Sequence, residues 1–138
     1  MTPSTAPHSP TREGFSLDVS RFPNVLVTLS GGMSLPGARV VTEALQDKVF
    51  ARREPYTLVI DATYASVPDA AARQHFAEFS KRNNAHTKRY CRAEAYVLPS
   101  AVLRGALTAI MWFSPFEYPH KVFATVDEAR AWVAQVAL

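Results

Sequence analysis

The sequence predicts a single α/β domain: a five-stranded, mostly parallel sheet with about four helices. Strand-like apolar runs alternate with amphipathic helical segments in the order ββαβαβαβα, which requires parallel strands joined by crossovers. Residues 58–60 (Leu-Val-Ile) are continuously apolar, as in a strand covered on both faces. Asp61 ends that run and Ser66 follows in the next polar stretch, the pattern of a parallel strand leading into a helix.

The first two strands are expected to form an antiparallel hairpin. Phe15 and Leu17 alternate with polar residues, which is typical of a half-buried strand. A second apolar run follows over 25–29, and Pro23 before it predicts a turn. Residues 1–13 hold few apolar side chains and are expected to be a disordered tail, so the folded domain is assigned to residues 14–138.

Helix boundaries follow from capping residues and prolines. Ser34 is predicted to cap a first helix that runs to about Arg53. Ser66 is predicted to cap a second helix over 67–83. The remaining elements are expected to be a strand over 90–98, a helix over 100–114, a strand over 120–125 and a terminal helix that begins at the capping box 125–128.

Apolar spacing predicts which helix faces lie against the sheet. In the third predicted helix, Val102, Ala106 and Ile110 are expected to form the buried stripe, with Leu103 and Leu107 nearby on the same flank. In the terminal helix, Trp132 and Val133 share one face, so Trp132 is expected to be buried against the sheet.

Composition narrows the class of protein. The chain has 138 residues, of which 48% are hydrophobic, enough for one core. The net charge of +3 gives a weak preference for anionic partners and disfavours a dedicated nucleic-acid binder. The single Cys91 excludes an internal disulfide, and no apolar run is long enough for a signal sequence or a membrane span. A soluble, cytoplasmic protein is expected.

The element order and three segments resemble the STAS domain, the fold of bacterial anti-sigma-factor antagonists, and the related SpoIIAA-like group. The segments are the opening strands over 15–31, residues 58–61 before a helix, and the closing strand and helix over 122–132 (VFATVDEARAW). The resemblance covers about residues 14–138. It implies a non-enzymatic regulatory or scaffold domain that acts through protein–protein interaction.

The resemblance also implies a phosphorylation site. In the family, a Ser or Thr in the loop after the Asp-ended strand is commonly phosphorylated by a partner kinase. Ser66 is the best positional match here, Thr63 is the second, and Asp61 is the acid of this loop. Pro68 stands where the family has a Gly, which departs from the pattern. The alternative is that Ser66 only caps the helix.

A second candidate site is the aromatic segment 111–119 (MWFSPFEYP). It holds four rings, on Trp112, Phe113, Phe116 and Tyr118. At least two rings are expected on the surface as one patch that binds a protein partner, a second copy of the chain or a lipid. The alternative is a loop that packs onto the sheet as part of the core.

Other motifs indicate little chemistry. The acid-free basic run over 81–92 is expected to be a solvated helix end rather than a nucleic-acid site. The four histidines lack metal-ligand spacing, and Cys91 is expected in the core. No catalytic residue, metal or cofactor is therefore predicted. The expected function is protein binding, and the alternative is a carrier of a lipid or another small apolar ligand.

Overall fold

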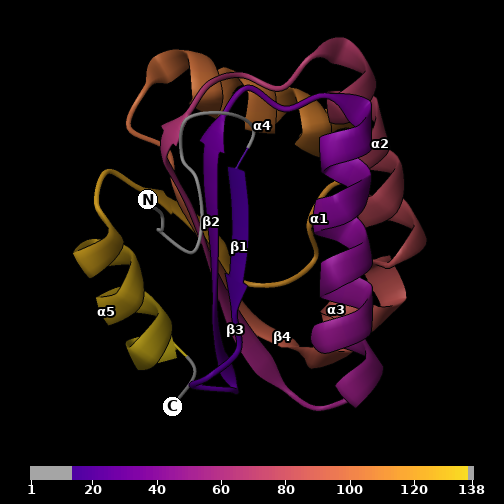
Figure 1. Cartoon of the computed structure of the whole chain (residues 1–138). Helices are drawn as coiled ribbons and strands as arrows, with labels where there is room; N and C mark the ends of the chain where they lie inside the picture. The colour runs from indigo at the N-terminus through magenta and orange to yellow at the C-terminus, as the bar shows by residue number, and fades with distance from the viewer. Residues whose placement is uncertain (1–13, 137–138) are drawn as a thin grey trace, which may run out of the picture.

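The structure is a computed structural model that describes residues 14–136, and the predicted disordered tail lies outside these residues. It contains a five-stranded sheet in the order β1-β2-β3-β4-β5 (Figure 1). β1 is antiparallel to β2, and the other neighbours are parallel, which confirms the predicted fold class. The strands are β1 (Gly14–Asp18), β2 (Asn24–Gly31), β3 (Tyr56–Ala65), β4 (Cys91–Val97) and β5 (His120–Phe123).

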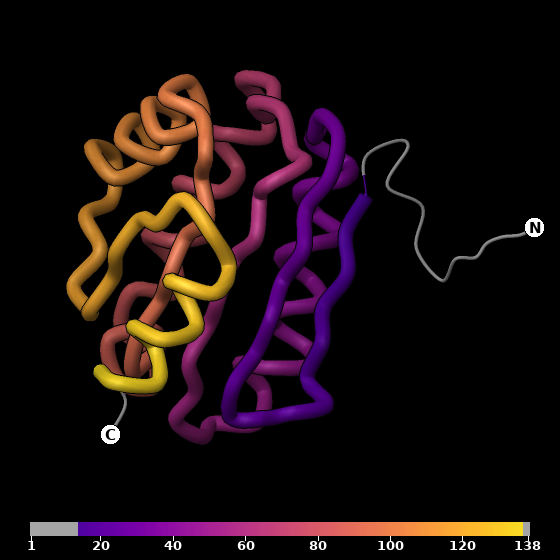
Figure 2. The backbone as a smooth tube through the Cα atoms, turned by 90° about the vertical axis from the view of Figure 1, so that its left-hand side faces the viewer, coloured from indigo at the N-terminus to yellow at the C-terminus, as the bar shows by residue number. Residues whose placement is uncertain are grey.

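Helices cover both faces of the sheet. Helix α5 lies alone on one face, which is turned toward the viewer in Figure 2. Helices α1, α2 and α3 lie on the opposite face, and α4 crosses the end of the sheet at the top of Figure 1 (Figures 1 and 2). The helices are α1 (Leu35–Lys48), the 3-10 helix η2 (Phe50–Arg52), α2 (Ala70–Arg82), α3 (Asn84–Tyr90), α4 (Ala101–Phe113) and α5 (Val126–Val136). The short α3 was not predicted, and the first helix ends at Lys48 instead of Arg53.

Successive residues along each strand point to opposite faces of the sheet. Leu58 of β3 lies in the core cluster under α1 and α2, whereas its neighbour Val59 lies in the cluster under α5. The register continues this alternation into β2, where Val25 pairs with Leu58 and Leu26 pairs with Val59. The continuous apolar run over 58–60 is explained by burial on both faces, as predicted.

The junction after this run differs from the prediction. β3 continues to Ala65, so Asp61 and Thr63 lie in a strand rather than in a loop. β2 is long enough to pair with these extra residues, with Thr28 opposite Asp61 and Gly31 opposite Ala65. The end of the strand is therefore set by its neighbour in the sheet.

The second helix also begins later than predicted. Asp69 is its N-cap, and its carboxylate accepts a hydrogen bond of 2.8 Å from the Ala72 N–H. The prediction that Ser66 caps this helix is wrong. Val67 precedes Pro68, and the proline ring disfavours the helical conformation for the residue before it, so the helix starts beyond the proline.

Two predictions of helix burial need correction. On α4, Ala106 and Ile110 lie on the inner side as predicted, but Val102 is 67% exposed and Leu103 is buried in its place. On α5, Trp132 is half-buried and packs against the Phe123 ring, with ring centroids 5.7 Å apart. Phe123 belongs to β5, the short edge strand, so Trp132 covers the border of the sheet while Val133 is buried.

Candidate functional site: an apolar cavity with a buried carboxyl group

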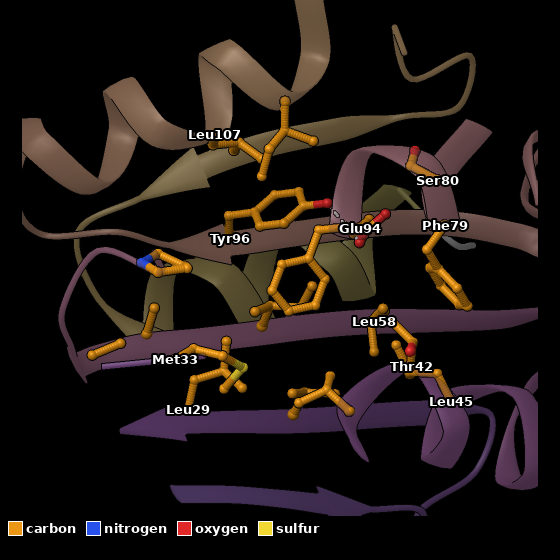
Figure 3. A pocket seen from close by; sticks show the side chains of 18 of the residues that line it. Leu29, Met33, Thr42, Leu45, Leu58, Phe79, Ser80, Glu94, Tyr96 and Leu107 are labelled. Carbon is orange, nitrogen blue, oxygen red and sulfur yellow. Dashed lines mark hydrogen bonds between the residues drawn. The ribbon is translucent and has the colours of Figure 1, made fainter. Parts of the chain in front are cut away.

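A cavity of about 190 Å³ lies between the sheet and helices α1, α2 and α4 (Figure 3). Its wall is mostly aliphatic and aromatic. Each surrounding element contributes side chains to it, among them Leu29 from β2, Leu45 from α1, Leu58 from β3, Phe79 from α2, Tyr96 from β4 and Leu107 from α4. Protein interiors are normally packed as densely as organic crystals, so a space of this size in a domain of this length is a candidate binding site.

Small side chains keep the space open. Ala62 and Ala65 of β3 and Ala106 of α4 all line the cavity. Leu103 packs onto Ala62 and the end of β4, and this contact holds α4 above the sheet. A larger residue at any of the three alanines would take up part of the volume.

Glu94 is the charged residue in this wall. It lies in β4, is only 6% exposed, and points to the cavity side of the sheet (Figure 3). The Tyr96 hydroxyl donates a hydrogen bond of 2.7 Å to Glu94 Oε2, and the Tyr118 hydroxyl is also hydrogen-bonded to the Glu94 carboxylate. Burial raises the pKa of Glu94, and the hydrogen bonds from Tyr118 and Tyr96 act in the opposite direction.

The two tyrosines are held as donors. Burial, followed by the nearby Glu94 charge, raises the pKa of both Tyr96 and Tyr118, so both hydroxyls stay protonated at neutral pH. Phe116 stacks between them, with its ring centroid 6.0 Å from Tyr96 and 5.4 Å from Tyr118. The carboxyl group thus sits in a wall of aromatic rings with two fixed hydrogen bonds.

The aromatic segment is split between the surface and the cavity. Trp112 is 84% exposed and Phe113 is 53% exposed, so two rings do lie on the surface. Phe116 and Tyr118 instead line the cavity, which corrects their placement in a surface patch. α4 ends at Phe113, and in the extended segment beyond Pro115 the alternate residues Phe116 and Tyr118 turn inward.

The two residues predicted for phosphorylation do not lie as expected, because Ser66 is not at the start of a helix and Thr63 lies in β3 rather than in a loop. Asp61 accepts hydrogen bonds from the backbone N–H and the hydroxyl of Thr63. Thr63 and Ser66 are exposed, and Ser66 lies at the edge of the cavity, where its N–H donates to the Gly31 carbonyl at 3.0 Å. Ser66 therefore precedes the helix by several residues instead of standing at its start.

The remaining candidates are structural or solvated. Cys91 is buried in the core as predicted, and burial raises the pKa of its thiol. The basic run spans the end of α2 and α3, where Lys88 forms an ion pair of 3.2 Å with Glu117. Within residues 14–136, no three potential ligands gather as a metal site, and no helix is long and apolar enough to cross a membrane.

Sequence reasoning missed Glu94, although a signal was present. The stretch 91–98 (CRAEAYVL) places an acid in the middle of a strand whose neighbours Ala93 and Ala95 are fully buried. Two-residue alternation puts Tyr96 on the same face as Glu94, so this pair could be found from the sequence. Tyr118 is far along the chain, and only the crossover through α4 brings it to Glu94.

Comparison with solved structures identifies the fold. The chain matches an uncharacterized DUF3478-family protein from Shewanella loihica PV-4 with a TM-score of 0.64 at 15% sequence identity, over 96% of this chain and 99% of that one. That protein is described as having a SpoIIAA-like fold. No protein-family model and no curated protein matches the sequence.

Two anti-sigma-factor antagonists share the same architecture. SpoIIAA in its unphosphorylated form matches with a TM-score of 0.61 at 16% identity, over 87% of this chain and 97% of that one. An anti-sigma factor antagonist from Mycobacterium paratuberculosis matches with a TM-score of 0.58 at 17% identity, over 91% of this chain and 97% of that one. The chain therefore has the STAS or SpoIIAA-like fold that its sequence resembles.

Proposed function

We propose that this chain is a non-enzymatic binding domain whose cavity holds a small apolar ligand. The observation that carries the proposal is the 190 Å³ cavity with its apolar wall. The wall of this half-open space is apolar surface that a filled core would bury, so keeping it open costs stability. A ligand that occupies the cavity gives a physical reason for keeping it.

The volume limits the size of the ligand. An apolar cavity of about 150 Å³ accepts a benzene molecule, so the 190 Å³ here suits a compound of about six to ten non-hydrogen atoms. A two-chain membrane lipid is much larger than this space. In the wall, Glu94 is hydrogen-bonded to Tyr96 and Tyr118, which supports binding rather than catalysis.

Binding of a protein partner is the second candidate function. Trp112 and Phe113 are exposed at the end of α4, and aromatic residues are enriched in the cores of protein interfaces. Two solved proteins of the same fold are named as anti-sigma-factor antagonists. The exposed rings favour a contact that uses the end of α4, with a partner protein or a second copy of the chain.

Phosphorylation at Ser66, or at Thr63, is the regulatory part of the protein-binding proposal. The exposed hydroxyls are accessible to a kinase. The N-terminus of α2 is already capped by the Asp69 carboxylate, so a phosphate on Ser66 would gain less from the helix dipole than one at a free helix start. A phosphate on Ser66 would instead act at the edge of the cavity.

Nuclear magnetic resonance titration with n-octanol tests the ligand proposal. We expect saturable shifts of the amide signals of Leu58, Tyr96 and Leu107, which line the cavity on three different elements. A cavity site would leave the signals of the exposed Val136 on α5, on the other face of the sheet, unchanged. Shifts confined to Trp112 and Phe113, or no saturable shift at all, would contradict an internal site.

A further inference from the structure

Burying the Glu94 carboxyl group at this position lowers the stability of the fold, which is unexpected if Glu94 has only a structural role. It lies between Ala93 and Ala95, both 0% exposed, and its side chain enters an apolar wall. A carboxyl group removed from water must be hydrogen-bonded, and an apolar residue of similar size would avoid the desolvation cost. The hydrogen bonds around Glu94 show what such a group could recognise.

The donors and acceptors at this point of the cavity are unbalanced. A tyrosine hydroxyl has one hydrogen to donate, and both Tyr96 and Tyr118 direct it at Glu94. In its ionised form, which the hydrogen bonds from Tyr118 and Tyr96 favour against the effect of burial, the Glu94 carboxylate can accept about four hydrogen bonds, so about two acceptor positions remain. The tyrosine oxygens keep their lone pairs as well. At this polar end of the cavity, acceptor atoms of Glu94 and the two tyrosines are available to a ligand, whereas the tyrosine O–H donors are already bonded to Glu94.

A histidine also lies beside Glu94. His120 of β5 is opposite Glu94 in the sheet register, and its ring lies edge-on to Phe116 at 5.3 Å. Its Nδ1 is 2.8 Å from the Tyr118 carbonyl oxygen, so this nitrogen is already engaged with the backbone. His120 thus adds to the electrostatic surroundings of Glu94 without replacing a ligand donor.

We propose that Glu94, Tyr96 and Tyr118 bind the polar group of the ligand, and that this ligand is a small apolar molecule with a hydrogen-bond donor. An alcohol, an amide N–H or an amine meets this requirement. A carboxylate ligand would place its oxygens against acceptors and is rejected. The inference rests on the proposed ligand function, because it specifies the chemistry of the same cavity.

Two isomeric probes test the inference in the unaltered protein. n-Octanol and heptyl methyl ether have the same atoms and nearly the same apolar surface, but the ether has no hydrogen-bond donor. Leaving a buried acceptor unpaired weakens binding by about 10-fold or more, so we expect the alcohol to bind about 10-fold more tightly than the ether. Octanoate at neutral pH is expected to bind more weakly than either.

A variant then assigns the preference to Glu94. Glu94→Gln keeps the size of the side chain but adds an N–H₂ donor, so the alcohol should lose its advantage over the ether. Glu43→Gln, an exposed change of the same kind on α1, should keep the 10-fold preference. Where Glu94→Gln fails to fold, the alcohol–ether comparison in the unaltered protein still tests whether the cavity prefers a ligand with a donor.

The outcomes separate the two proposals. If neither probe binds, the cavity does not take small apolar ligands, and both proposals fail. If the alcohol and the ether bind equally well in the unaltered protein, the ligand function stands and the role of the Glu94 group is overturned. The role of Glu94 is also overturned if folded Glu94→Gln keeps the full preference for the alcohol.

Discussion

Replacing Ala106 with leucine tests whether the cavity is real space in solution. Ala106 is half-buried on α4 and lines the cavity. The change adds three carbon atoms, worth about 2 kcal/mol of burial at about 0.8 kcal/mol per methylene. Ordering the leucine side chain costs about 0.5–1 kcal/mol. We therefore expect Ala106→Leu to raise the free energy of unfolding by about 1–1.5 kcal/mol.

Urea denaturation measures the effect against a matched control. Ala109 lies on the same helix and is exposed, so Ala109→Leu adds the same atoms outside the cavity. The control should change the stability by less than about 0.5 kcal/mol. Both variants should keep the same dependence of stability on urea concentration, so that the shift in midpoint reports stability alone.

The opposite sign would refute the reasoning. Forcing a side chain into a closed core destabilises a protein by about 1–3 kcal/mol. A loss of that size in Ala106→Leu, with Ala109→Leu unchanged, would show that the space under α4 is filled in solution. The stabilised variant should also bind n-octanol less tightly, because its leucine occupies part of the site. Stabilisation with undiminished octanol binding would place the octanol elsewhere.

Three further predictions test other parts of the structure. Burial, followed by the charge of Arg53, lowers the pKa of His86 in the folded protein. The neutral histidine therefore contributes stability above about pH 6.5, and this contribution is lost as the pH falls below that value. His86→Phe should make the free energy of unfolding, measured between about pH 7 and 5, less dependent on pH. Trp132→Ala should lower the free energy of unfolding by about 2 kcal/mol, less than for a fully buried tryptophan, and a change below about 0.5 kcal/mol in urea denaturation would contradict packing on β5. The double change Trp112→Ser and Phe113→Ser should reduce any self-association seen by sedimentation with little effect on stability, and unfolding would show that these rings are core.

Strand and helix types were predictable because local patterns coincide with the environment. The alternation around Phe15 and Leu17 and the continuous run over 58–60 describe how many faces of each strand are covered. Boundaries were less predictable, because they depend on partners. β3 extends past Asp61 only because β2 is long enough to pair with it. The seven-residue α3 carries no apolar periodicity that could reveal it.

The candidate site was less predictable than the fold. The rings of Phe116 and Tyr118 were identified, but their direction depends on how the segment after α4 returns to the sheet. Glu94 could be noticed as an acid inside a buried strand, whereas its pairing with Tyr118 requires the three-dimensional register of β4 and β5. An empty volume leaves no mark in a sequence, since it depends on the distance between a helix and the sheet.

The two candidate functions meet in α4. Its inner side, through Leu103 and Leu107, borders the cavity, and its end carries the exposed Trp112 and Phe113. A ligand below the helix therefore contacts the element that would present these rings to a partner. Linkage requires that any effect of the ligand on partner affinity be matched by an equal effect of the partner on ligand affinity. Measuring n-octanol affinity with and without a bound partner would thus show whether α4 joins the two functions, and equal affinities would show that its two sides act independently.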